Sequence, residues 1–195
     1  MAKRNVILLF SMLLVIAVVI IGVTYIKNTA KAGAESARDR SVVAFDELKS
    51  DNYAQLSALD DIQCQRMNWY SAKHCDASDT RVYSVARGET TQNQVAEKLR
   101  RSGWLSSDNG FMSSQSGTSG LGMTRNLNDN TSGVSSQQDI RIVITDRVPT
   151  NNSVYFQGTN FRYNDESLKS KLQTVIDKGD TLMIIIIHNY YDTWL

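Results

Sequence analysis

The C-terminal part of this chain contains the run Leu182-Met183-Ile184-Ile185-Ile186-Ile187. Its six residues are all apolar, with no alternation between apolar and polar positions. A strand with one face in water alternates, whereas a strand buried on both faces forms a continuous apolar run. We therefore predict a strand that is buried on both faces, in a sheet covered on both sides.

A helix is predicted immediately before this strand. Asn164 or Asp165 supplies its N-cap and Gly179 its stop. Its apolar residues recur at helical spacing and define one buried face. They are Leu168, Leu172, Val175 and Ile176.

The segments upstream alternate between strand and helix. Residues 81–86 and 139–145 have strand character, and residues 90–101 have helical spacing. Residues 154–163 form either a hairpin about Gly158 or one bulged strand. The order predicts an α+β domain at 81–195 with a ferredoxin-like βαββαβ sandwich. Its two helices would cover one sheet face, and a helix expected at residues 27–61 or a loop would cover the other.

Residues 102–138 within this domain are rich in Ser and Gly and carry almost no charge. Such a composition buries too little apolar surface to offset the entropy lost on ordering. We predict a long flexible loop.

The longest apolar run of the chain is Val6–Ile26, which contains no ionisable side chain. As a helix it spans about 30 Å, the thickness of a hydrocarbon core. We predict a transmembrane helix at 6–26, inserted in a lipid bilayer, after a short tail at 1–5. A cleaved signal peptide, with a site near Ala30-Lys31-Ala32, is the rival interpretation, but signal cores run only ~7–15 residues.

Residues 27–61 are predicted to continue as a helical stalk. Apolar residues recur there at roughly helical spacing, and Gly33 is its expected soft point. The recurring residues are Val42, Phe45, Leu48, Leu56 and Leu59.

Two features of the sequence give opposite predictions for the orientation of this helix in the membrane. Four basic residues follow the helix and two precede it, which by number favours a cytoplasmic C-terminal side. Large domains, however, translocate largely regardless of their charge. We expect a single-pass protein with a cytoplasmic N-terminus and its domain outside the cytoplasm.

Residues 62–80 form a predicted loop that contains both cysteines, Cys64 and Cys75. In an oxidising compartment the two thiols can form a disulfide. Two alternatives stay open: a pair of free buried thiols, and a metal site that adds His74 and Asp76.

Composition and motifs exclude several functions. The chain has 21 Lys and Arg against 20 Asp and Glu residues, so it lacks the basic surface that nucleic-acid binding requires. The segment Gly117–Gly122 is followed by Met123 where a phosphate-binding loop needs Lys. We expect no enzymatic activity and no cofactor.

Aromatic residues near the C-terminus are candidates for a binding surface. Tyr190, Tyr191 and Trp194 either gather as an exposed patch or cap the end of the sheet.

Two further segments carry family resemblances. Tyr83–Gly88 with the helix after it, and Tyr155–Phe161 with its own helix, resemble the two halves of a SPOR-type peptidoglycan-binding domain. The first half also resembles the opening of LysM-like modules. The resemblance implies a βαββαβ fold and a cell-wall glycan as partner.

The segment Phe10–Ala17 resembles the hydrophobic start of type IV pilins and implies a surface subunit. It departs from that family at Leu9, where pilins have a small residue, and at Leu14, where they have Glu.

The sequence thus predicts a membrane-anchored envelope protein with a non-enzymatic extracytoplasmic domain. This domain would act in protein interaction or assembly, through a protein partner or self-association. The alternatives are a glycan-binding envelope module and a pilin-like surface subunit.

Overall fold

A computed structural model describes residues 2–49, 52–66, 73–106, 120–127, 134–148, 153–156, 159–162 and 166–193. Within these ranges the side chains are described except at 2–10, 26, 27, 29, 30, 66, 106, 134, 136, 153–156, 159–162 and 193.

The described residues form a mixed α+β structure, which confirms the predicted class. Six antiparallel strands form one sheet in the order β1-β2-β8-β5-β4-β3, and β6 and β7 form a separate hairpin. The helices are α1 (Ala2–Leu48), α2 (Gln92–Arg101) and α3 (Glu166–Asp177). The strands are β1 (Ala54–Arg66), β2 (Lys73–Val85), β3 (Leu105–Ser106), β4 (Gly120–Asn126), β5 (Val134–Thr145), β6 (Ser153–Phe156), β7 (Thr159–Arg162) and β8 (Thr181–Thr193).

Strand β8 contains the predicted isoleucine run and lies between β2 and β5 in the sheet. The side chains of Leu182–Ile187 are at most 1% exposed, so the prediction of burial on both faces is confirmed. Met183 and Ile185 pack on the α1 and α2 side, whereas Ile184 and Ile186 pack on the α3 side.

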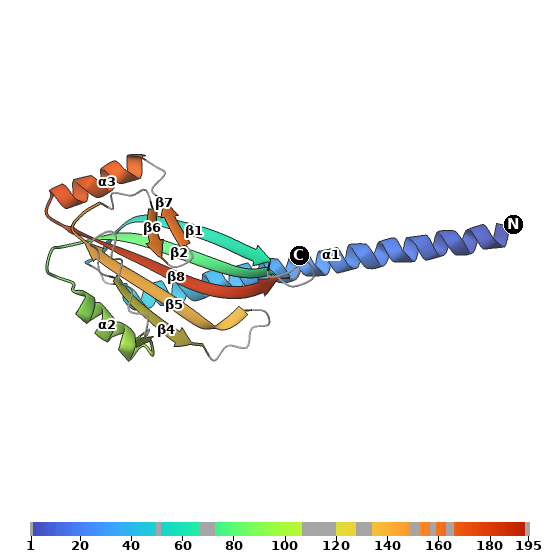
Figure 1. The fold of residues 1–195 in the computed structure, drawn as a ribbon, viewed down its shortest axis with the longest axis horizontal. Helices are drawn as coiled ribbons and strands as arrows, with labels where there is room; N and C mark the ends of the chain where they lie inside the picture. The colour runs from blue at the N-terminus through green and yellow to red at the C-terminus, as the bar shows by residue number, and fades with distance from the viewer. Residues whose placement is uncertain are drawn as a thin grey trace.

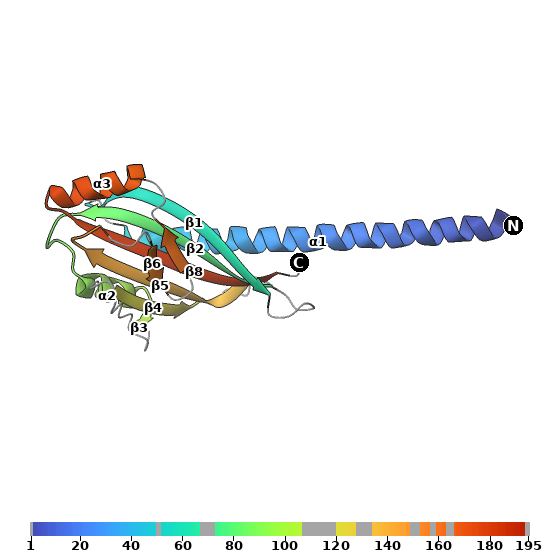
Figure 2. The same cartoon turned by 45° about the horizontal axis from the view of Figure 1, so that its top comes forward.

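The two sheet faces have different helical covers. The C-terminal part of α1 and helix α2 lie on one face, where Phe45 and Leu99 enter the same apolar cluster (Figures 1 and 2). Helix α3 lies on the other face through Leu172. The prediction that α2 and α3 share a face is therefore wrong, while the predicted cover by the stalk helix is confirmed.

The ferredoxin-like βαββαβ arrangement, also implied by the SPOR resemblance, is wrong as well. Strands β6 and β7 pair only with each other in the described chain, and three strands absent from that scheme, β1, β3 and β4, extend the sheet. The hairpin reading of residues 154–163 is correct.

The predicted stalk at 27–61 is helical only to Leu48. Residues 54–66 form β1, which pairs along its length with β2. Strand β1 lies at the sheet edge, so it has few apolar residues. The helical spacing of Leu56 and Leu59, on which the stalk prediction relied, is therefore accidental. The predicted loop at 62–80 is largely the end of β1 and the start of β2, with 67–72 outside the described residues.

Gly33 was predicted as a soft point, yet α1 continues through it without a break. A Cβ placed on Gly33 would lie 2.9 Å from Cδ2 of Tyr191 in β8. Glycine therefore allows α1 to approach the sheet closely at the position where the helix first meets it.

The predicted loop at 102–138 contains β3, β4 and the start of β5, so it is structured in part. Residues 107–119 and 128–133 lie outside the described residues. The predicted helices around 90–101 and 168–176 are confirmed, and Gly179 ends α3 with φ +91°.

Helix α1 extends well beyond the sheet toward the N-terminus (Figure 1). Among the helices of the described residues, none is found that is long and apolar enough to cross a membrane. The transmembrane role of residues 6–26 is therefore unsupported by the described residues and stays a prediction.

Candidate functional site

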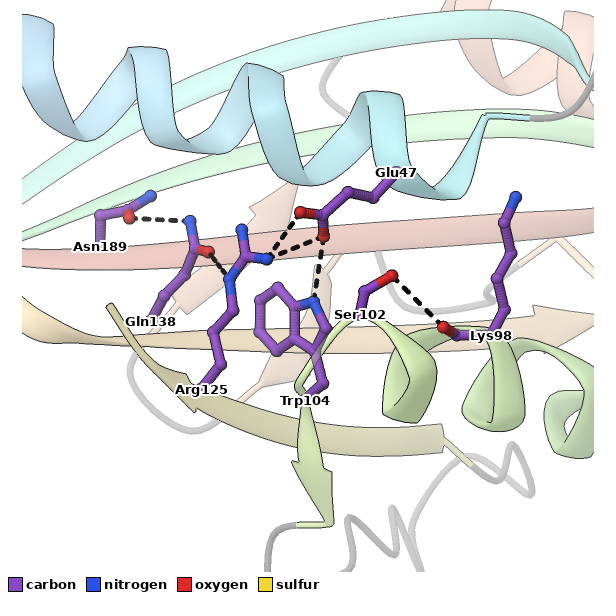
Figure 3. A network of polar contacts seen from close by, with 7 residues as sticks. All are labelled: Glu47, Lys98, Ser102, Trp104, Arg125, Gln138 and Asn189. Carbon is purple, nitrogen blue, oxygen red and sulfur yellow. Dashed lines mark hydrogen bonds and ion pairs between the residues drawn. The ribbon is translucent and has the colours of Figure 1, made fainter. Parts of the chain in front are cut away.

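A buried polar network holds α1 on the sheet (Figure 3). Nη1 of Arg125 in β4 donates to both carboxylate oxygens of Glu47 in α1, at 2.8 Å each. The indole Nε1 of Trp104 donates to Glu47 at 3.3 Å, and the Arg125 guanidinium lies 4.4 Å from the centre of the Trp104 ring. Glu47 therefore receives two donors from outside its own helix.

The same network continues across the sheet and returns to α1. Nε of Arg125 donates to Gln138, whose amide nitrogen donates to Asn189, at 2.9 Å each. The Asn189 amide donates to the Ser41 hydroxyl of α1 at 2.8 Å. Since these side chains are buried, each unmade bond would cost the desolvation of its polar group. The network fixes the position of α1 and carries no evident chemistry.

A groove lies between α1 and the β1–β2 hairpin. It has a volume of about 180 Å³ and is lined by Ala34, Glu35, Arg38 and Ser41 of α1, Asp60, Asp61 and Ile62 of β1, and Ala77, Ser78 and Asp79 of β2. Arg38 forms an ion pair with Asp60 at 3.3 Å.

Asp60 and Asp79 are directly paired residues of β1 and β2, so two carboxyl groups meet across the strands. Burial, and next the charge of Asp60, raise the pKa of Asp79 from 3.8 to about 6, while Arg81 acts in the opposite direction. At neutral pH the groove holds a buried carboxylate next to another carboxylate.

Replacing Asp79 by Asn is expected to stabilise the fold at pH 7–8. Because the pKa of Asp79 is higher in the folded than in the unfolded chain, the folded state loses stability as pH rises from about 4 to about 6. A shift of about two units, discounted for solvent screening, corresponds to about 1–2 kcal/mol. Urea unfolding of D79N and the wild type at pH 4 and pH 8 measures this difference. A destabilised D79N at pH 8 would contradict the expectation.

The sheet face that α3 covers also carries a second polar cluster. Nδ1 of His188 lies 3.0 Å from Oδ2 of Asp76, and the Tyr190 hydroxyl donates to Asp139 at 3.1 Å. His188 is fully buried, and its Nε2 has no hydrogen-bond partner among the described residues. Among these residues no group of three or more His, Cys, Asp or Glu side chains is placed to hold a metal ion.

A wider cavity of about 440 Å³ opens where the C-terminal end of α1 approaches the N-terminal end of α2. Met183 and Val95 are among its apolar lining residues, and Asn52, Glu89 and Gln94 are among the polar ones. The Tyr53 and Thr90 hydroxyls, also at this cavity, are 3.1 Å apart and join its two sides.

The predicted disulfide between Cys64 and Cys75 is present. The two cysteines are directly opposite each other on β1 and β2, so neither is a free thiol or a metal ligand. The other two residues of the predicted metal site have separate partners. His74 pairs with Asp192, and Asp76 pairs with His188.

The predicted aromatic surface is not assembled from the tyrosines that the structure describes. Tyr191 is buried against α1, near Gly33 and Ala37. Tyr190 points to the opposite face, where its ring stacks on His74 with a centroid distance of 5.6 Å. Trp194 lies outside the described residues.

No sequence pattern marks Glu47, Arg125, Asp60 or Asp79 as part of a site. Glu47 and Arg125 are 78 positions apart, and no local pattern indicates their contact. The proximity of Asp60 and Asp79 follows only from the register of the β1–β2 hairpin.

Comparison with known proteins places the chain in no established group. No protein-family profile matches it, and neither a curated protein nor a solved structure shows a significant match.

Proposed function

We propose that this chain is a single-pass membrane-anchored envelope protein whose extracytoplasmic α+β domain acts in protein interaction or assembly. The N-terminal tail faces the cytoplasm and the segment Val6–Ile26 lies in the bilayer. The Cys64–Cys75 disulfide supports an oxidising compartment for the domain.

The observation that carries the proposal is the unburied apolar surface of α1. Met12, Leu14, Ile21 and Tyr25 are between 67% and 70% exposed, and many apolar neighbours are exposed with them. A helix that is apolar on every side is stable when lipid or other protein surrounds it. The domain itself covers α1 only in its C-terminal part.

A pilin-like surface subunit is the second candidate, and one feature favours it. The exposed apolar segment and the helix that covers the sheet belong to one uninterrupted element, α1. We call the part of α1 that precedes Gly33 the stem. A continuous helix fixes the direction of this stem relative to the domain, which suits regular packing of copies. Glycan binding stays a prediction from the sequence.

Fractionation of cells that express the full chain tests the anchor. We expect the protein in the membrane pellet after high-salt and alkaline washes, and in solution after detergent. The variant I16K/I20K, at two exposed stem positions, is expected to shift the protein to the soluble fraction, because each charge in the bilayer centre costs about 2.5–3.5 kcal/mol.

The control variant V43K changes an exposed apolar residue of α1 beside the domain and is expected to stay in the pellet. Protease added to spheroplasts is expected to digest the domain and leave the tail intact. Wild-type protein in the detergent-free soluble fraction would refute the anchor.

A further inference from the structure

The groove between α1 and the β1–β2 hairpin has the chemistry of a receptor for one long basic side chain. Ala34, Ile62 and Ala77 provide apolar walls, and Asp60 and Asp79 provide two carboxyl groups. Lys and Arg side chains combine an apolar stem with a charged head, so they match both parts of such a groove. We call it the acidic groove.

Asp79 is the residue that points to a missing partner. It is only 7% exposed, and its Oδ1 has no hydrogen-bond partner among the described residues. A buried carboxylate oxygen without a donor is costly, and each such group in a folded protein requires an explanation. The charges of Arg81 and Arg38 oppose the rise in the pKa of Asp79, but Arg38 forms its ion pair with Asp60.

Among the described residues, the His, Cys, Asp and Glu side chains form no group of three or more placed to hold a metal ion. An ammonium or guanidinium group does fit, because it donates several hydrogen bonds and needs no fixed coordination shell. The ligand is therefore a basic side chain that arrives from outside the groove.

We propose that the acidic groove receives a lysine from the stem of a second copy of this chain. Two lysines, Lys27 and Lys31, directly follow the apolar run of α1. Lys31 is 75% exposed, and its own ion pair with Glu35 is exposed too, so little is lost when it changes partner. This inference rests on the proposed function, because stems that share a bilayer lie side by side.

The geometry of α1 sets the offset between the two copies. Lys31 precedes Arg38, at the groove, by seven residues, or about 10 Å along a helix. A neighbouring copy moved by about this distance along the stem brings its lysine level with the groove. Donor and receptor are different surfaces, so the contact is heterologous and continues as an open series.

Isotope-resolved cross-linking of the full chain in detergent micelles tests the contact. A carbodiimide joins amines to carboxylates without a spacer, and a mixture of ¹⁴N- and ¹⁵N-labelled chains identifies links between copies. We expect a ladder of oligomers, with mixed-isotope links between the 27–31 segment and Asp60 or Asp79.

Two variants each remove one side of the contact. K27E/K31E and D79N are each expected to reduce the ladder by about tenfold or more, since losing one partner of a buried charge pair typically costs over 1.4 kcal/mol. A mixture of the K27E/K31E and D79N variants is expected to yield dimers but no larger oligomers, because only one productive contact can form between them. D177N, on exposed α3, is the matched control and keeps the ladder.

Several outcomes overturn the proposal: a monomeric wild type, a D79N ladder equal to the wild-type ladder, or a mixture that forms no dimers. Capture of another protein in place of a second copy also counts against it. Membrane retention of D79N, measured in parallel, separates this result from failure of the proposed anchor.

Discussion

Replacement of Arg125 by Met is expected to lower the free energy of unfolding by about 3–5 kcal/mol. Arg125 is buried, and its guanidinium satisfies both Glu47 oxygens and the Gln138 amide oxygen at once. Met fills part of the volume over Trp104 but leaves a partly buried carboxylate without its cation. Urea unfolding followed by far-UV circular dichroism measures the change.

The variant R101M is the matched control for R125M. Arg101 pairs with Glu97 at 3.2 Å, yet both side chains are more than half exposed. Such surface pairs contribute about 0–1 kcal/mol. The double variant E47Q/R125M removes both charges and is expected to recover part of the loss. Equal effects of R101M and R125M would contradict the importance of the network.

Removal of the disulfide by C64A/C75A is expected to lower the free energy of unfolding by about 3 kcal/mol. The bond joins residues 11 positions apart and restricts the unfolded chain around the hairpin turn. It also holds β1, an edge strand whose outer side has no neighbour in the described sheet. The hairpin is therefore expected to fray first.

Reductant separates this effect from the loss of side-chain packing. Dithiothreitol is expected to destabilise the wild type by a similar amount and to leave C64A/C75A unchanged. Cys75 is fully buried, so any additional loss in the double variant reports packing at that position. A wild type whose unfolding is insensitive to reductant would contradict the stabilising role of the bond.

The polar network fixes the C-terminal part of α1 to the sheet. The helix leaves the domain as one rigid element, and Glu47 and Ser41 fix it to strands β4, β5 and β8. Gly33 then brings α1 against Tyr191 where the stem begins. A displacement of the stem would therefore also displace the side chains that connect α1 to the sheet. The acidic groove lies along this same helix, where a neighbouring copy would contact it.

Local sequence patterns predicted the elements that bury a full apolar face. The run at 182–187 is the central strand, and the helical faces of α2 and α3 lie on the core. An oxidising compartment favours a disulfide among the three interpretations of the two cysteines, and this bond is present. Strands β1, β3 and β4 escape prediction because edge and near-edge strands bury few side chains, so their patterns are weak.

The candidate sites depend on contacts that no local pattern encodes. Asp60 and Asp79 meet only through the register of two strands, and Tyr190 and Tyr191 separate because neighbouring strand residues face opposite ways. A patch predicted from adjacency in sequence was therefore divided between the two faces of the sheet.

Hydrophobic burial leaves a periodic record along the chain, so local patterns reveal the long apolar N-terminal segment, the doubly buried strand and the α+β class. The folded arrangement is needed to know which helix covers which face, that β8 lies at the sheet centre, and that two carboxyl groups share one groove. Those outcomes follow from strand order and register, which depend on contacts between residues far apart in the chain.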